Sequence, residues 1–107
     1  MSLQWDRDFA FEQSGEDEEL LAELLDLLCL SSEADLEKIR KAADAGDAGA
    51  VGEAAHSIKG ASASLGLAGL RDVAYDMEKK GNAGDLDGAL SHLSALESLV
   101  SELSALK

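Results

Sequence analysis

The sequence is most informative over residues 55–66, which read AHSIKGASASLG. His56 is followed by Lys59 three residues later and by Gly60 four residues later. Residues three and four apart are neighbours on a helix surface, so a helix here would give His56 a cation on one side and no side chain on the other. An imidazole in that setting can accept and return a phosphoryl group while another protein lies against it. No other part of the chain points so clearly to chemistry.

The helix that carries His56 is predicted to begin after Asp47, a suitable N-cap, and to end near Leu65, before Gly66. Its core stripe is predicted to contain Val51, Ala54, Ala55, Ile58, Ala61, Ser62 and Leu65. Because an α-helix turns by about 100° per residue, His56 lies roughly 140–160° from the middle of that stripe and is predicted to face outward. The same rotation places Gly49, Gly52, Gly60 and Ala63 on the outer face around it.

Glycines inside a helix need an explanation, because each weakens the helix by up to about 1 kcal/mol relative to alanine. We interpret the small residues Gly52, Gly60 and Ala63 as candidate docking positions, where a partner comes close to the imidazole. Lys59 is a candidate catalytic residue, since its ammonium group could pair with the oxygens of a phosphoryl group on His56. The neutral imidazole available near neutral pH makes His56 the candidate nucleophile.

The remaining sequence predicts further amphipathic helices. Trp5 and Phe9 are spaced by one helical turn and predict a short N-terminal helix that closes the domain. Ser14, with Asp17 three residues on, resembles a capping box for a helix that runs to about Ala43 and has Leu20, Leu21, Leu24, Leu27 and Leu28 on one face. Ser31 and Ser32 inside this run could mark a kink or a break into two helices, and the pattern leaves both open.

Two more helices are predicted after Gly66. One starts at Leu67 or Ala68 and ends at Lys79-Lys80-Gly81, with cations in its last turn. The last helix is capped by Asp85 and carries Leu86, Ala89, Leu93, Leu96, Val100 and Leu103 on its inner face, with serines facing solvent. Short loops between helices imply antiparallel neighbours. We therefore expect residues 1–107 to form one all-α domain, an antiparallel up-down four-helix bundle with a short N-terminal accessory helix.

Composition supports this fold and restricts the partners. The chain has no proline, is 46% apolar and only 4% aromatic, which predicts a helical core of leucine and alanine. Its formal charge of −13 disfavours nucleic acid and anionic membrane surfaces as partners. The single cysteine, Cys29, fits a reducing compartment, and the first residues lack the pattern of a secretion signal. We expect a cytoplasmic protein.

His56, Lys59, Gly60 and Gly66 reproduce the His-x-x-Lys-Gly-x-x-x-x-x-Gly pattern of histidine-containing phosphotransfer (HPt) domains, and residues 55–60 resemble that family's usual Ala-His-Thr-Leu-Lys-Gly. The resemblance extends to the leucine-rich stretch from Phe9 to Leu28, the turn at residues 45–47, and Leu70 with Glu78. It therefore covers nearly the whole chain.

The resemblance implies roles for these residues. His56 would be the phosphoacceptor, Lys59 would assist electrostatically, Gly60 would leave room for the partner, and Gly66 would end the helix. The implied function is that of a phosphocarrier, without kinase activity of its own, that moves a phosphoryl group between receiver-domain aspartates. The implied partners are response-regulator receivers and a sensor (hybrid) histidine kinase. No cofactor or metal belongs to the chain itself, since the Mg²⁺ that assists transfer would lie on the receiver, and a monomer is expected.

Other functions are also compatible with parts of the sequence. The chain could be the phosphoacceptor domain of a chemotaxis-type kinase, charged from ATP by a separate catalytic domain. A docking module that binds receivers without transfer would be expected to lack the reactive histidine, and His56 is present. A metal-binding bundle is less favoured, because His92 is 36 residues away on another predicted helix and neither histidine has an acidic partner three or four residues after it.

Overall fold

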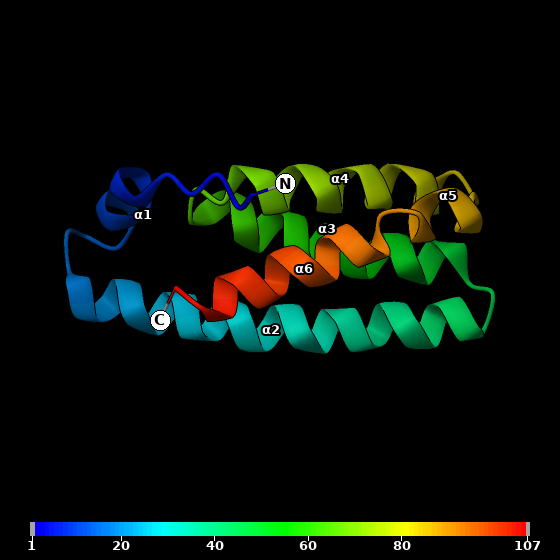
Figure 1. The fold of residues 1–107 in the computed structure, drawn as a ribbon, viewed down its shortest axis with the longest axis horizontal. Coiled ribbons are helices and arrows are strands. Elements are labelled where there is room, and N and C mark those ends of the chain that lie inside the picture. Colours follow the sequence, from blue (N-terminus) through cyan, green and yellow to red (C-terminus); the bar gives the residue numbers. More distant parts are fainter. Residues whose placement is uncertain (1, 107) are drawn as a thin grey trace.

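The computed structural model describes residues 2–106, and these residues form six helices and no strand. The helices are α1 (Arg7–Gln13), α2 (Glu18–Asp44), α3 (Ala48–Ser64), α4 (Ala68–Asn82), α5 (Leu86–Leu90) and α6 (Leu93–Ser104). The four long helices α2, α3, α4 and α6 run alternately up and down (Figure 1). The predicted antiparallel four-helix bundle with an N-terminal accessory helix is confirmed.

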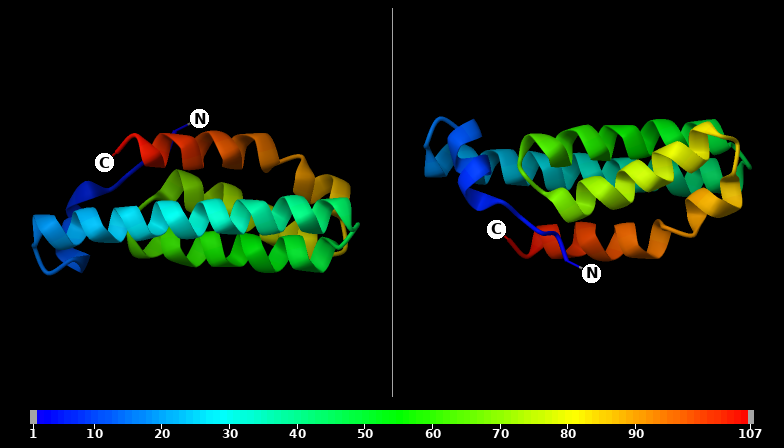
Figure 2. Two further views of the ribbon diagram at one scale, coloured as in Figure 1. Left: turned by 90° about the horizontal axis from the view of Figure 1, so that it is seen from below. Right: turned by 90° about the horizontal axis from the view of Figure 1, so that it is seen from above.

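The bundle encloses one core of mainly leucine and alanine, with α3 between α2 and α4. α6 packs against α2 and α4 and closes the bundle on the side away from α3 (Figure 2). None of the helices in the described part of the chain combines the length and the apolarity needed to cross a membrane.

Aspartate side chains cap the N-termini of four helices, and Asp6 does so for α1 by accepting a hydrogen bond from the backbone N–H of Phe9. Asp17 accepts hydrogen bonds from the backbone N–H groups of residues 19 and 20, Asp47 from that of residue 50, and Asp85 from that of residue 88. The predicted caps at Asp47 and Asp85 are confirmed. The capping box at Ser14 is wrong, because Ser14 ends α1 instead, where its hydroxyl donates to the Ala10 carbonyl over 2.7 Å.

The structure decides whether two long helical stretches of the sequence are continuous. α2 is one helix through Ser31 and Ser32, and Ser31 satisfies its hydroxyl within the helix by donating to the Leu28 carbonyl. The predicted single last helix is wrong, because it is interrupted at Ser91 and His92 between α5 and α6. The Ser91 hydroxyl donates to the Gly88 carbonyl over 2.6 Å, a local bond that competes with helix continuation.

The N-terminal segment holds the turn between α3 and α4. The Trp5 indole N–H donates to the Leu65 carbonyl over 3.0 Å, and the Asp6 N–H donates to the Gly66 carbonyl over 2.9 Å. The predicted short N-terminal helix is present as α1, but Trp5 precedes it. The prediction that Trp5 and Phe9 share a helical face is therefore wrong, and Phe9 is exposed. Gly66 has φ +72°, and a Cβ there would lie 2.8 Å from the Asp6 carbonyl oxygen. Glycine is thus needed at this turn both for its backbone angle and for space.

Candidate functional site

His56 lies on the exposed side of α3. The helix buries Val51, Ala55 and Ile58 against the core, as its periodicity predicts, and turns the imidazole away from them. The His56 side chain is 65% exposed. A partner protein can therefore reach the ring without any rearrangement of the bundle.

A carboxylate from the neighbouring helix holds the imidazole. Nδ1 of His56 is hydrogen-bonded to Oε2 of Glu78, which lies on α4 and has a side chain only 9% exposed. A carboxylate can only accept, so Nδ1 carries a hydrogen, and in the neutral ring the lone pair lies on Nε2. The pair thus orients the ring and leaves the lone pair of Nε2 available for a nucleophilic step.

Lys59 binds the second oxygen of the same carboxylate. Its Nζ donates to Glu78 Oε1 over 2.7 Å, and its side chain is half-buried. Glu78 therefore bridges the two residues that the sequence singled out, one helical turn apart on α3. The ammonium group and the imidazole therefore share one carboxylate.

The electrostatic balance of Glu78 follows from these contacts. Burial acts to raise the pKa of the Glu78 carboxyl, but the hydrogen bonds from Lys59 and His56, together with the charges of those groups, outweigh burial and hold its pKa below the ordinary value of 4.5. The carboxylate is therefore ionised at neutral pH, as its role as acceptor for His56 Nδ1 requires.

Two of the three predicted docking positions lie on the surface. Gly60 and Ala63 are exposed on α3, and a Cβ at Gly60 would have no atom within 4 Å. The prediction that Gly52 lies on the outer face is wrong, because Gly52 is buried against α4. A Cβ at Gly52 would lie 2.5 Å from Asn82 Oδ1, and one at Gly81 would lie 2.7 Å from the Gly52 backbone nitrogen. The glycine at position 52 serves helix packing instead of docking.

The close approach of α3 and α4 is what completes the site. With only hydrogen atoms between the two backbones at Gly52 and Gly81, the helices pack closely enough for one side chain of α4 to reach His56 and Lys59 together. Sequence reasoning missed Glu78 as a site residue. The available signal was its position one turn after Ala74 and one turn before Gly81 on the buried stripe of α4, where an unpaired charge would be costly.

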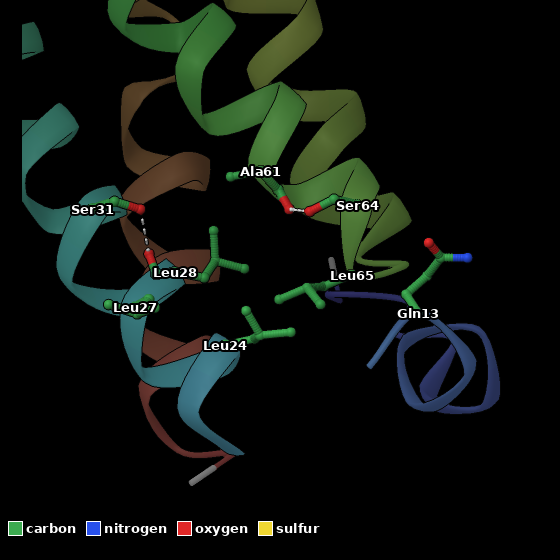
Figure 3. A pocket seen from close by; sticks show the side chains of 8 residues that line it. All are labelled: Gln13, Leu24, Leu27, Leu28, Ser31, Ala61, Ser64 and Leu65. Carbon is green, nitrogen blue, oxygen red and sulfur yellow. Dashed lines mark hydrogen bonds between the residues drawn. The ribbon is translucent and has the colours of Figure 1, made fainter. Parts of the chain in front are cut away.

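An apolar pocket opens beside the histidine helix, between α2 and α3 (Figure 3). It has a volume of about 430 Å³ and is lined by Gln13, Leu24, Leu27, Leu28, Ser31, Ala61, Ser64 and Leu65. Leu27 is 61% exposed, and Leu20 and Leu30 on the same helix are 40% and 65% exposed. The prediction that Leu20 and Leu27 face the core is therefore wrong, and α2 presents apolar surface next to α3.

His92 takes no part in the hydrogen bonds of this site. It is half-buried at the start of α6, and its Nε2 has no hydrogen-bond partner among residues 2–106. Within the same residues, no group of three or more histidine, cysteine, aspartate or glutamate side chains could hold a metal ion. The site that the fold assembles is thus His56, Glu78 and Lys59, with Gly60 and Ala63 beside them.

Replacing Glu78 by glutamine tests the charge on the carboxyl. At neutral pH we expect Glu78→Gln to be less stable than the parent by about 1 kcal/mol, because hydrogen bonds to an ionised group are stronger than those to an amide. A carboxyl with a lowered folded pKa loses its stabilising contribution as the pH falls below 4.5 toward the folded value. The stability difference should therefore narrow over that range in urea unfolding followed by circular dichroism. A constant difference would contradict the ion-paired state of Glu78.

Comparisons with known proteins identify the family and the fold. The model of the family described as "Hpt domain" matches residues 23–106. The fold is similar to the crystal structure of histidine-containing phosphotransfer protein B (HptB) from Pseudomonas aeruginosa PAO1, with a TM-score of 0.88 and 27% sequence identity over 99% of this chain and 92% of that chain. Among curated proteins, none matches the sequence.

Proposed function

Because the chain belongs to the Hpt domain family, we propose that this histidine phosphotransfer protein takes a phosphoryl group from the aspartyl phosphate of one receiver domain and gives it to an aspartate of another. The observation that carries this proposal is the exposed imidazole of His56, oriented through Nδ1 by the buried carboxylate of Glu78. Domains of this family are carriers rather than kinases, so the phosphoryl group comes from a partner.

The geometry supports a direct transfer step. The Nε2 lone pair attacks the phosphorus of the aspartyl phosphate, the bond from phosphorus to the aspartate oxygen breaks, and the aspartate leaves as a carboxylate. The ring then bears the phosphoryl group on Nε2 and a hydrogen on Nδ1, so it carries a positive charge that the Glu78 carboxylate stabilises. The second receiver reverses these steps, because its aspartate attacks the phosphorus and the N–P bond breaks.

Lys59 assists by charge. Its Nζ donates a hydrogen bond to the Glu78 carboxylate, which also binds Nδ1 of His56. From there the ammonium group is proposed to pair with the oxygens of the transferring phosphoryl group. Phosphoryl transfer involves little covalent chemistry by the protein, and positioning and charge neutralisation supply most of the rate. We place the Mg²⁺ that neutralises further charge on the receiver, and assign no metal or cofactor to this chain.

The surface around His56 suits a receiver domain as partner. Gly60 and Ala63 allow close approach to the imidazole, and the apolar pocket between α2 and α3 offers area to bury. We propose that receivers of response regulators and of a sensor (hybrid) histidine kinase dock here on a monomeric carrier. A cytoplasmic location is proposed on the basis of the single cysteine, Cys29, which is buried in the core.

The proposal is tested with phosphorylated receivers. The protein is incubated with a panel of receiver domains that carry an aspartyl phosphate, in the presence of Mg²⁺, and its intact mass is followed at neutral pH. We expect the gain of one acid-labile phosphoryl group, and its loss when an unphosphorylated second receiver is added. Uptake only from ATP with a separate chemotaxis-type catalytic domain would make the chain a kinase phosphoacceptor instead. Binding of receivers without transfer would make it a docking module.

A further inference from the structure

The negative charge of the chain is distributed unevenly between its helices. Residues 48–82, which form α3, α4 and the turn between them, contain four acidic and four basic residues, so this part is formally neutral. The formal charge of −13 therefore lies on the remainder of the chain. A partner with an acidic surface is repelled by most of the molecule and least by the face that α3 and α4 form.

The exposed side of α4 carries a row of cationic and aromatic side chains. Arg71, Tyr75 and Lys79 are spaced by four residues and are all exposed. The Tyr75 ring centre lies 4.4 Å from Lys79 Nζ and 5.0 Å from Nζ of Lys59 on α3. The ring therefore makes cation–π contacts with two ammonium groups, one from each helix. We call Lys59, Arg71, Tyr75 and Lys79 the cationic surface.

Each cation of this surface has an acidic partner within the chain, and the partners of Arg71 and Lys79 are accessible to solvent. Arg71 pairs with Asp72 over 3.0 Å and Lys79 pairs with Asp76 over 3.4 Å, and all four side chains are largely solvent-accessible. Exposed pairs of this kind contribute little to stability, so the carboxylates of a partner can replace the internal ones. The third acidic residue of α4, Glu78, is buried and already engaged by Lys59 and His56.

The cationic surface begins at the phosphoacceptor site. Lys59 shares the Glu78 carboxylate with His56 and also lies over the Tyr75 ring. Lys59, Arg71, Asp72 and Tyr75 line an open pocket of about 440 Å³ on this side of α3. α3, which carries the imidazole, therefore contributes to two different surfaces, the apolar pocket shared with α2 and the cationic surface shared with α4.

We propose that the cationic surface receives the acidic rim of a receiver domain while the aspartyl phosphate of that receiver meets His56. This inference rests on the function proposed above. Mg²⁺ is bound in proteins mainly by carboxylates, so a receiver that holds Mg²⁺ beside its reacting aspartate has acidic side chains there, which complement Lys59, Arg71 and Lys79. Arginine and tyrosine are also residue types that contribute strongly to protein interfaces. The acidic remainder of the chain disfavours other orientations of the same partner.

The test compares charge reversals on and away from this surface. Lys79→Glu and Arg71→Glu are compared with Lys41→Glu, which makes the same change in net charge at an exposed position on α2. Phosphoryl uptake is measured from one phosphorylated receiver that charges the parent chain, at ionic strengths of about 20 and 150 mM. Phosphoramidate, a small donor that needs no docking surface, reports the reactivity of His56 in each variant. Lys79→Arg keeps the charge and serves as the conservative variant.

We expect Lys79→Glu and Arg71→Glu each to lower kcat/KM about fivefold at the low ionic strength, because reversing a rim charge mainly slows association. The loss should shrink at the higher ionic strength, where screening shortens the range of charge interactions. For Lys79→Glu and Arg71→Glu, kcat at saturating receiver and the rate of labelling by phosphoramidate should stay within about twofold of the parent, because association limits neither. For the controls Lys41→Glu and Lys79→Arg, kcat/KM should also stay within about twofold of the parent.

Two outcomes would overturn the inference in distinguishable ways. If the parent takes up phosphoryl groups from a receiver and Lys79→Glu, Arg71→Glu and Lys41→Glu all behave alike, the docking surface is wrong and the carrier function stands. If the parent is charged by no receiver, the carrier function fails and this inference fails with it.

Discussion

A His56→Gln variant will take up no phosphoryl group from any receiver that charges the parent. Glutamine can still donate a hydrogen bond to Glu78, but its amide nitrogen has no available lone pair with which to attack phosphorus. The residual uptake should fall below detection, because Lys59, which shares the Glu78 carboxylate, is held there as an ammonium group that has no lone pair. Intact mass at neutral pH, before and after brief acidification, measures both the phosphoryl group and its acid lability.

The control for this experiment is the second histidine. His92→Gln should retain full uptake, because His92 lies at the start of α6 and away from Glu78. The stability of His56→Gln should stay within about 0.5 kcal/mol of the parent, as is usual for an exposed position, so loss of uptake cannot be attributed to unfolding. Undiminished uptake by His56→Gln would refute the assignment of the phosphoacceptor.

A Gly81→Ala variant will be destabilised by about 1–3 kcal/mol, the usual cost of inserting a methyl group where no space exists. The new Cβ would lie 2.7 Å from the Gly52 nitrogen and 2.8 Å from the Ala48 carbonyl oxygen, and both are backbone atoms of α3 that cannot rotate away. The helices must separate, and Glu78 moves with α4 away from His56 and Lys59. We therefore expect slower phosphoryl uptake as well, measured beside urea unfolding.

Gly60→Ala is the matched control for this prediction. Gly60 also lies inside a helix, but a Cβ there has no atom within 4 Å. The variant should be more stable than the parent by about 0.5–1 kcal/mol, because alanine has the higher helix propensity. If Gly81→Ala were as stable as Gly60→Ala, the close packing of α3 on α4 would not be needed for the fold.

Local signals in the sequence accounted for much of the fold. Asp47 and Asp85 begin helices because their side chains accept hydrogen bonds from backbone groups three residues away. Gly66 ends α3 because it adopts a positive φ that other residues adopt with strain. Such effects involve only a few neighbouring residues, so they can be predicted without knowledge of the remaining chain. The break at Ser91 escaped prediction because the apolar spacing on its two sides continues unchanged.

The exposure of residues on α2 and α3 could be predicted only in part. Rotation around α3 correctly placed His56, Gly60 and Ala63 outside and incorrectly placed Gly52 there. A helical wheel separates inner from outer positions, but it does not say where a second helix will lie along the border. Gly52 is covered because α4 approaches at that border, and Leu27 stays exposed because no helix covers it.

The helical fold and the pairing of His56 with a cation one turn away follow from the sequence alone, since periodicity, caps and the spacing of His56 and Lys59 are local properties. The carboxylate that binds both side chains is known only from the packed structure. Glu78 is 22 residues from His56 in the chain, and the two meet because glycines on α3 and α4 let the backbones come into contact. That contact depends on the packing of two surfaces, which no local pattern encodes.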